Sequence, residues 1–288
     1  MMTTTDFTYS SIYSYGKEVL LGEKIDDSEF DAMELLLFAF NISREHYVLN
    51  RAKAIATSEV NKYLELIERR KKGEPLQYIL GKWEFYGLDF KVGKGVLIPR
   101  PETEMLVAYS LEYIKDKPKP RVLDLCSGSG CIPIAIAKSY PLASVYGVEI
   151  SDIAYNYFIE NIELNSTSNV TPIHCDIFEL NIDSEKFDVI TSNPPYIKTS
   201  VIPSLQRELE FEPALALDGG DDGLIFYRYI ASLAPKMLKK DGMLAVEIGE
   251  EQGEDVKNLF IQNSFSDISI EKDFNGLDRV VKGYYRID

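Results

Sequence analysis

The stretch that decides the fold of this chain is Val122-Leu123-Asp124-Leu125-Cys126-Ser127-Gly128-Ser129-Gly130. It consists of an apolar run with one acidic residue and a glycine-rich turn, and an apolar helical pattern follows over residues 131–139. A buried strand that turns tightly into a helix is typical of an open, mostly parallel α/β sheet. In such a sheet the turn places backbone N–H groups at the carboxyl edge, where ligands bind.

The turn does not match the dinucleotide-binding pattern G-x-G-x-x-G. Only Gly128 and Gly130 are present, and Pro133 occupies the third glycine position. Proline is tolerated there because the first turn of a helix needs no N–H from it. A small nucleoside-like ligand therefore fits the turn better than a pyrophosphate, although a glycine-rich turn taken alone can be merely structural.

Strand and helix patterns alternate from residue 121 onward. The predicted helices cover residues 131–139, 152–164, 224–238 and 253–262, and the predicted strands cover residues 121–125, 144–149, 170–176, 187–193, 243–248, 267–272 and 279–285. This alternation predicts a mostly parallel sheet with helices on both faces. The last two strands are joined through Phe274-Asn275-Gly276 and are predicted to pair as an antiparallel hairpin.

Residues 1–80 show helical patterns only. Ser28 and Asp31 predict a variant capping box that opens a helix with an apolar face of Phe30, Met33, Leu36, Leu37 and Phe40. A second helix is predicted from Thr57 or Ser58, with Val60, Tyr63, Leu64 and Ile67 on one face. It ends at Arg69-Arg70-Lys71-Lys72 before Gly73, which we interpret as a solvated helix end rather than a nucleic-acid or partner contact.

Residues 81–98 change in character and predict a β-hairpin linker between Trp83–Tyr86 and Val96–Ile98. The segment Pro99-Arg100-Pro101 then leads rigidly into a further helix. The chain is thus expected to comprise a helical domain at 1–80, the linker at 81–98 and an α/β domain at 99–288.

Two carboxylates end neighbouring strands of the predicted sheet. Glu149 follows Gly130 by nineteen residues, where the second strand of such a fold presents an acceptor pair to a ribose diol. Asp176, followed by Ile177, ends the next strand and is placed to accept a hydrogen bond from an adenine amino group. Taken alone, each of them could also be an ordinary polar strand end.

Asn193-Pro194-Pro195-Tyr196 follows the apolar run of residues 187–192. Two prolines fix φ and exclude helix for the residue before each, so the segment is stiff and extended or turned. An amide and a ring hydroxyl on such a segment are suited to bind a planar NH₂ group at the end of a strand.

Composition excludes several classes of protein. Three cysteines without a CxxC pair and two histidines give no zinc or disulfide pattern, so no metal is expected. We expect a cytoplasmic protein, since the first thirty residues show no secretory signal and no apolar run reaches the length of a membrane span.

The net charge is −15. Residues 1–80 contain 10 basic and 13 acidic residues, and the remainder contains 21 basic and 33 acidic residues. Neither part has the cationic balance of a nucleic-acid binder.

Several motifs together resemble one family. Asp124–Gly130, Glu149, Asp176 and the Asn193–Tyr196 tetrapeptide resemble the ordered motifs of class I S-adenosylmethionine-dependent methyltransferases that methylate a planar nitrogen. Further stretches resemble the peptide chain release factor glutamine methyltransferases (the HemK/PrmC family), over essentially the whole chain. These stretches are Pro75–Gly81, Ile98–Glu104, Glu212-Pro213 with Ala216-Leu217 and Gly219-Gly220, and Glu247-Ile248-Gly249. Cys126 stands where many relatives carry glycine, and Glu149 where aspartate is also frequent.

The resemblance implies a Rossmann-like seven-stranded sheet with an antiparallel last strand, preceded by a small all-α domain that docks the release factor. It implies methyl transfer from S-adenosylmethionine to N5 of the glutamine in a Gly-Gly-Gln motif, by a monomer that binds release factors and contacts neither membrane nor nucleic acid. The implied catalytic residues are Asn193, Pro194, Pro195 and Tyr196. The implied cofactor-binding residues are Asp124, Cys126, Ser127, Gly128, Ser129, Gly130, Glu149, Asp176, Ile177 and Asn193. Arg100 and Glu102 are implied to lie near the cofactor and the substrate entrance.

Two other functions remain open from the sequence. The same tetrapeptide would serve an amino-methyltransferase that acts on adenine N6 or guanine N2 of a nucleic acid, although such enzymes must also bind the backbone and, in a duplex, flip the base. A non-catalytic module that binds a release factor or a nucleotide is the third reading. It would not need both the glycine turn and the tetrapeptide.

Overall fold

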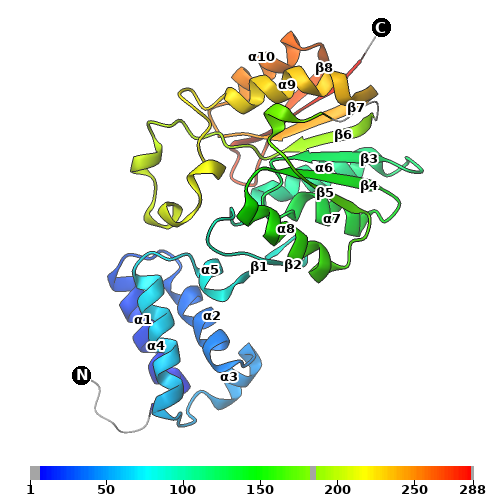
Figure 1. The fold of residues 1–288 in the computed structure, drawn as a ribbon. Helices are drawn as coiled ribbons and strands as arrows, with labels where there is room; N and C mark the ends of the chain where they lie inside the picture. Colours follow the sequence, from blue (N-terminus) through cyan, green and yellow to red (C-terminus); the bar gives the residue numbers. More distant parts are fainter. Residues whose placement is uncertain (1–6, 182–185, 287–288) are drawn as a thin grey trace. The chain divides into compact units, whose positions relative to one another are not determined.

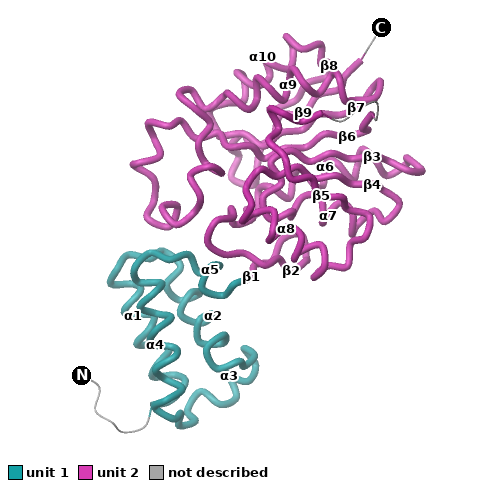
Figure 2. Tube along the Cα trace, in the orientation of Figure 1, with its two compact units in different colours: residues 1–81 teal, residues 82–288 magenta. Residues whose placement is uncertain are grey.

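A computed structural model describes residues 7–181 and 186–286 of the chain. The chain divides into two compact units, Met1–Gly81 and Lys82–Asp288 (Figure 2). The expected domain ranges 1–80 and 99–288 include some residues outside the described part.

The first unit is helical throughout its described part. It comprises α1 (Tyr9–Gly22), α2 (Ser28–Phe40), α3 (Arg44–Asn50), α4 (Thr57–Lys71) and α5 (Leu76–Leu80). Thr8 and Ser11 form a capping box that starts α1. Gly16 allows α1 and α4 to approach closely, because a Cβ atom there would lie 2.0 Å from the hydroxyl of Tyr63. The helices thereby enclose a small core of their own.

Three predictions for this unit were wrong. Ser28 does not cap α2, because Asp27 occupies the N-cap position and makes no side-chain capping bond. The carboxylate of Asp31 instead accepts a hydrogen bond of 2.6 Å from the guanidinium of Arg70, and both side chains are buried. Arg70 is therefore not part of a solvated helix end. The buried face of α2 is accordingly Asp31, Ala32, Leu35, Leu36 and Ala39, while the predicted Phe30 is exposed.

The second unit contains a seven-stranded sheet (Figure 1). Its strands are β3 (Arg121–Leu125), β4 (Ser144–Glu149), β5 (Val170–His174), β6 (Phe187–Ser192), β7 (Leu238–Glu247), β8 (Phe265–Lys272) and β9 (Asp278–Tyr285). They lie in the order β5-β4-β3-β6-β7-β9-β8, and β9 runs antiparallel to both of its neighbours. The predicted sheet and its antiparallel last strand are confirmed.

Helices cover both faces of this sheet. One face packs against α6 (Glu104–Ile114), α7 (Cys131–Ser139) and α8 (Asp152–Asn165), and the other against α9 (Ile225–Met237) and α10 (Gly253–Gln262). Alternate residues of a strand point to opposite faces, so Val122 joins the first core and Leu123 the second. Short 3₁₀ helices follow several strands or enter helices: η1 (Pro101–Thr103), η2 (Ile177–Glu179), η3 (Ile202–Ser204), η4 (Arg207–Phe211) and η5 (Ala214–Ala216).

The hairpin before the sheet differs from the prediction. It pairs β1 (Lys82–Phe85) with β2 (Leu88–Lys91), whereas Val96–Ile98 is not a strand. Tyr86 and Gly87 both have positive φ, at 53° and 72°, which is the geometry of a two-residue hairpin turn. This turn closes the hairpin early and frees residues 92–98 to form a loop.

No helix within residues 7–181 and 186–286 combines the length and apolarity needed to cross a lipid bilayer.

Candidate active site

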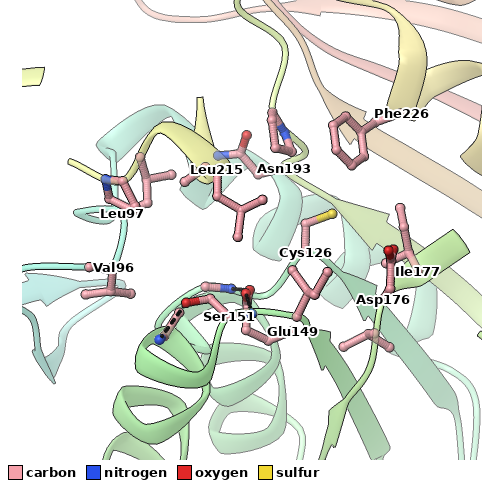
Figure 3. Close-up of a pocket in the computed structure, with 18 of the residues that line it drawn as sticks. Val96, Leu97, Cys126, Glu149, Ser151, Asp176, Ile177, Asn193, Leu215 and Phe226 are labelled. Carbon is pink, nitrogen blue, oxygen red and sulfur yellow. Dashed lines mark hydrogen bonds between the residues drawn. The ribbon is translucent and has the colours of Figure 1, made fainter. Parts of the chain in front are cut away.

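Two adjoining cavities lie at the carboxyl ends of the central strands. The first has a volume of about 180 Å³ and the second about 160 Å³. Leu97, Asn193 and Ala216 line both, so the cavities meet at these residues. The first cavity is drawn in Figure 3, where Glu149 and Asn193 lie on opposite sides. The second is completed by Arg100, Tyr196, Ile197, Leu209, Leu217 and Glu247.

The glycine-rich turn between β3 and α7 forms part of the first cavity. Cys126, Gly128 and Gly130 have positive φ, at 61°, 56° and 79°. A Cβ atom on Gly130 would lie 2.0 Å from the ring of Phe158, so glycine is required there for packing as well as for conformation. A Cβ atom on Gly128 would have no neighbour within 4 Å in residues 7–181 and 186–286, so open space lies beside the turn in this part of the chain.

Glu149 ends β4 directly beside this turn. Its Oε2 accepts a hydrogen bond of 2.8 Å from the Gly128 N–H, and its Oε1 accepts one of 2.7 Å from the Ser151 N–H. Burial raises the pKa of the carboxyl, while the backbone N–H groups oppose that rise. Each carboxylate oxygen has a second lone pair, so Glu149 can still accept hydrogen bonds from a ligand diol.

The other end of the first cavity combines one carboxylate with aromatic rings. Asp176 caps η2 by accepting a hydrogen bond of 2.9 Å from the Phe178 N–H. The rings of Phe178 and Phe226 lie 5.5 Å apart, and Ile177 and Leu215 add aliphatic surface. This arrangement suits a flat apolar group with a hydrogen-bond donor on its edge.

Asp124 lies beneath the turn and does not line either cavity. Its Oδ1 accepts a hydrogen bond of 2.7 Å from the Thr191 hydroxyl, and its Oδ2 has no hydrogen-bond partner among the described residues. Complete burial raises the pKa of this carboxyl to about 7. The unpartnered oxygen marks a place where a ligand donor or a water molecule would be favourable.

Asn193 is oriented by a buried hydrogen-bond chain. Its Nδ2 donates to the Thr103 hydroxyl at 3.2 Å, and that hydroxyl donates to Glu247 Oε2 at 2.6 Å. No described residue donates to Asn193 Oδ1. The amide oxygen is therefore available to a donor from outside the chain.

The backbone of the tetrapeptide is held by the loop that precedes α9 and by Gln252 at the N-terminus of α10. The carbonyl of Tyr196 accepts a hydrogen bond of 3.1 Å from Gln252 Nε2. Gly219 and Gly223 lie so close that a Cβ atom on either would meet backbone atoms of Tyr196 at 2.7 Å and 2.4 Å. These contacts fix the position of the tetrapeptide at the wall of both cavities.

Glu212 joins the segment before α6 to the same loop region. Its Oε2 accepts a hydrogen bond of 3.1 Å from the Ile98 N–H, and its Oε1 pairs with the Arg100 guanidinium. Asn161 in α8 performs a similar function on the other side. It exchanges two hydrogen bonds with the backbone of Lys91 and donates a third, of 3.0 Å, to the Ser129 carbonyl. Residues 92–98 are thus anchored at both ends where they border the cavities.

The structure brings most of the predicted site residues together. Cys126, Gly128, Glu149, Asp176, Ile177, Asn193 and Pro195 line the first cavity, and Asn193 and Tyr196 line the second. Asp124, Ser127, Ser129, Gly130 and Pro194 line neither, although Ser127, Ser129 and Gly130 shape the turn. Arg100 lines the second cavity, and Glu102 lines neither.

Thr103, Glu212 and Glu247 lie in stretches that resemble the family, but no role in the site was predicted for them from the sequence. No role was predicted either for Asn161, Phe178, Leu215, Phe226 and Gln252. A signal existed for Glu247, because it ends a buried strand at the ligand-binding edge as Glu149 does. The others depend on contacts between distant segments. Within the described residues, no group of three or more His, Cys, Asp or Glu side chains could hold a metal ion.

The first cavity fits the S-adenosylmethionine that the resemblance implies. Glu149 offers acceptors for a ribose diol, and Asp176 an acceptor beside an aromatic and aliphatic surface for adenine. The open space at Gly128 lies on the side of the glycine turn, where a polar amino-acid part would be accommodated.

Two family models match the chain. The PrmC N-terminal domain matches residues 11–81, and a methyltransferase domain matches residues 116–272. A release factor glutamine methyltransferase of Thermodesulfovibrio yellowstonii is 43% identical over 255 residues, which cover 87% of this chain and 90% of the relative. One of Geobacter sulfurreducens is 40% identical and covers 96% of both chains.

A solved structure of the hMettl16 catalytic domain in complex with an RNA hairpin has a TM-score of 0.59. It is 15% identical in sequence and covers 84% of this chain and 87% of its own. At that identity the likeness concerns the fold alone.

Proposed function

The chain belongs to the release factor glutamine methyltransferase family, and we propose that it methylates N5 of the glutamine in a Gly-Gly-Gln motif of peptide chain release factors. It is an S-adenosylmethionine-dependent protein-glutamine methyltransferase. The position of Asn193 is the main support for this site. Asn193 lines both cavities, and no described residue donates a hydrogen bond to its amide oxygen.

We propose that the first cavity holds the cofactor. Glu149 binds the ribose hydroxyls, Asp176 the adenine amino group, and Ile177 and Phe178 the adenine ring. The turn at Cys126–Gly130 surrounds the amino-acid part. When bound, S-adenosylmethionine supplies a methyl group on a positively charged sulfur.

The second cavity then receives the glutamine side chain. An amide nitrogen is a poor nucleophile, because its lone pair is delocalised into the carbonyl. Asn193 Oδ1 and the Pro194 carbonyl would accept both N–H groups and orient the nitrogen toward the wall shared with the first cavity. Catalysis by orientation of this kind can lower a barrier by about 7–11 kcal/mol.

Tyr196 and Pro195 complete the site. Tyr196 lines the second cavity, where its side chain packs against the substrate amide, and Pro195 beside it lines the first cavity. Together the two side chains exclude water from the site. Burial raises the pKa of the Tyr196 hydroxyl, which therefore stays protonated and does not act as a base. No strong base is needed before transfer, because the nitrogen becomes acidic once it is methylated.

We also propose a docking function for the first unit. A tripeptide motif offers little surface, so recognition of a whole release factor requires a second contact area. The match of residues 11–81 to the PrmC N-terminal domain supports this assignment. We further propose a cytoplasmic monomer that binds one release factor and does not bind nucleic acid directly.

The test is methyl transfer from labelled S-adenosylmethionine to a purified release factor, to duplex DNA or to ribosomal RNA. Label on the motif glutamine, located by peptide mass spectrometry, is the expected result. Replacement of that glutamine by alanine in the release factor is the matched control and should remove the label. Label confined to nucleic acid would overturn the proposed function.

A further inference from the structure

Glu247 and Thr103 are buried polar residues that the reaction described above does not use. Glu247 ends β7, Thr103 ends η1, and both are 2% exposed. They come from segments 144 residues apart and meet through a hydrogen bond of 2.6 Å. A buried carboxylate at the edge of the substrate cavity is costly unless its interactions serve the fold or the site.

We propose that Glu247 and Thr103 are positioning residues that hold the Asn193 amide with its oxygen toward the substrate. The inference rests on the proposed function, because it concerns how the same tetrapeptide grips the substrate amide. Its basis is the direction of the hydrogen bonds in the Glu247–Thr103–Asn193 chain.

The direction of these two hydrogen bonds follows from the number of protons that each group can donate. A threonine hydroxyl has one proton to donate, and an ionised carboxylate can only accept. While Glu247 is ionised, the proton of Thr103 is committed to Glu247 Oε2, so Thr103 can only accept from Asn193. The NH₂ group of Asn193 must then face Thr103, and Oδ1 must face away from it.

The opposite orientation would be unproductive. If Thr103 donated to Asn193 Oδ1, the amide would turn and present its NH₂ group to the NH₂ group of the substrate. Two donors cannot form a hydrogen bond, so the grip on the glutamine nitrogen would be lost. The ionisation of Glu247 therefore sets the orientation of the Asn193 amide through the Thr103 hydroxyl.

The surroundings of Glu247 make this ionisation sensitive to pH near neutrality. Burial raises the pKa of the carboxyl to about 7, and the Thr103 hydrogen bond opposes the rise. The charged and titratable groups around it come from five segments: Arg100 and Glu102 before α6, Cys131 in α7, Tyr196 after β6, Tyr227 in α9 and Arg279 in β9. The two arginines favour the ionised form and Glu102 disfavours it.

The decisive variants are Thr103→Val and Thr103→Ser. Valine keeps the shape of threonine and removes the hydroxyl, whereas serine keeps the hydroxyl. Ser110→Ala is the matched control, because Ser110 is a buried residue of α6 whose hydroxyl, among the described residues, bonds only to the Leu106 carbonyl. Single-turnover methylation of a release factor is measured at saturating S-adenosylmethionine from about pH 5 to about pH 9, together with the affinity for each ligand.

Thr103→Val is expected to slow methyl transfer by about 100-fold, as for misplaced catalytic groups, while both affinities stay close to wild type. Thr103→Ser should restore most of the rate, and Ser110→Ala should keep it. The wild-type rate should fall as the pH drops through about 7, the pKa of Glu247, and this fall should be absent in Thr103→Val.

Glu247→Gln provides a second measurement if valine disturbs folding. A glutamine can donate to the Thr103 hydroxyl and release its proton toward Asn193, so the rate should be low and independent of pH in this range. Wild-type rates in Thr103→Val, or an unchanged pH profile in either variant, would overturn the proposal. Absence of release factor methylation by the wild-type protein would instead contradict the proposed function.

Discussion

Arg100 and Glu212 are 112 residues apart in the sequence and form an ion pair at the edge of the second cavity. Glu212 is almost completely buried, while the side chain of Arg100 is 34% exposed. The same carboxylate accepts the Ile98 N–H, so one side chain ties the loop before α6 to the segment after η4. This link closes one wall of the second cavity.

Glu212→Ala is expected to lower the free energy of unfolding by about 1–3 kcal/mol, because it leaves the buried Ile98 N–H without an acceptor. The exposed part of Arg100 can be hydrated, which limits the loss. Urea denaturation gives the difference. Glu254→Ala removes an exposed carboxylate whose one ion-pair partner within the described part of the chain is Lys257, and it should change stability by less than about 0.5 kcal/mol. Equal effects of the two substitutions would contradict the assigned link.

Asn193→Ala tests the grip on the substrate amide. We expect turnover to fall by about 100-fold to 1000-fold, the loss typical of a missing polar group at a reacting centre. Cofactor affinity should change little, since the ribose and adenine contacts remain. Asn263→Ala, at the end of α10, removes a comparable amide that bonds to the Leu259 carbonyl and should leave turnover intact. Near-normal turnover of Asn193→Ala would show that the grip lies elsewhere.

Glu149→Gln should weaken cofactor binding rather than turnover at saturation. A glutamine has one oxygen in place of two, so it cannot accept from Gly128, Ser151 and a ribose diol at once. The loss of a charged acceptor predicts an affinity for S-adenosylmethionine about 10-fold to 100-fold lower. Isothermal titration calorimetry measures it, and an unchanged dissociation constant would remove Glu149 from the cofactor site.

Comparing Gly130→Ala with Gly276→Ala separates the cost of a packing clash from the cost of backbone conformation in the free energy of unfolding. The methyl group would lie 2.0 Å from the buried ring of Phe158 at a φ of 79°, so we expect a loss of about 2–4 kcal/mol in unfolding free energy. Gly276→Ala is the matched control, because the φ of Gly276 is 78° and no atom of the residues that the structure describes lies within 4 Å of the added Cβ. It should lose only the conformational part, about 1 kcal/mol. Similar losses at both positions would mean that Phe158 moves aside without cost.

Asp124 predicts a pH dependence of stability. Its pKa is about 7 in the folded protein and 3.8 ordinarily, because burial disfavours the charged form. Between these values the folded state binds a proton that the unfolded state lacks, so the free energy of unfolding falls as pH rises. The asparagine side chain in Asp124→Asn cannot ionise, so the free energy of unfolding of this variant lacks the fall that Asp124 causes. The stability of the wild type relative to Asp124→Asn should therefore decrease from about pH 5 to about pH 8 in urea denaturation. A constant difference would contradict the burial of an ionisable Asp124.

The sequence alone predicted the strands of the sheet and the helices between them, because each depends on apolar periodicity among near neighbours. The run 187–193 and the pattern from Val122 to Gly130 needed no distant contact to be recognised. The same local reasoning failed where a distant partner decided the outcome. Asp31 offered a plausible cap in sequence, but Arg70, 39 residues away, binds its carboxylate.

Only the tertiary structure decided how the tetrapeptide is oriented. Asn193 and Thr103 are 90 residues apart, and Thr103 and Glu247 are 144 apart. They meet because β6 and β7 are neighbours in the sheet and η1 lies against their carboxyl ends, an arrangement that no local pattern records. Backbone conformation is set by adjacent residues. The direction of a hydrogen bond between side chains is set by whichever donors and acceptors the completed fold brings together.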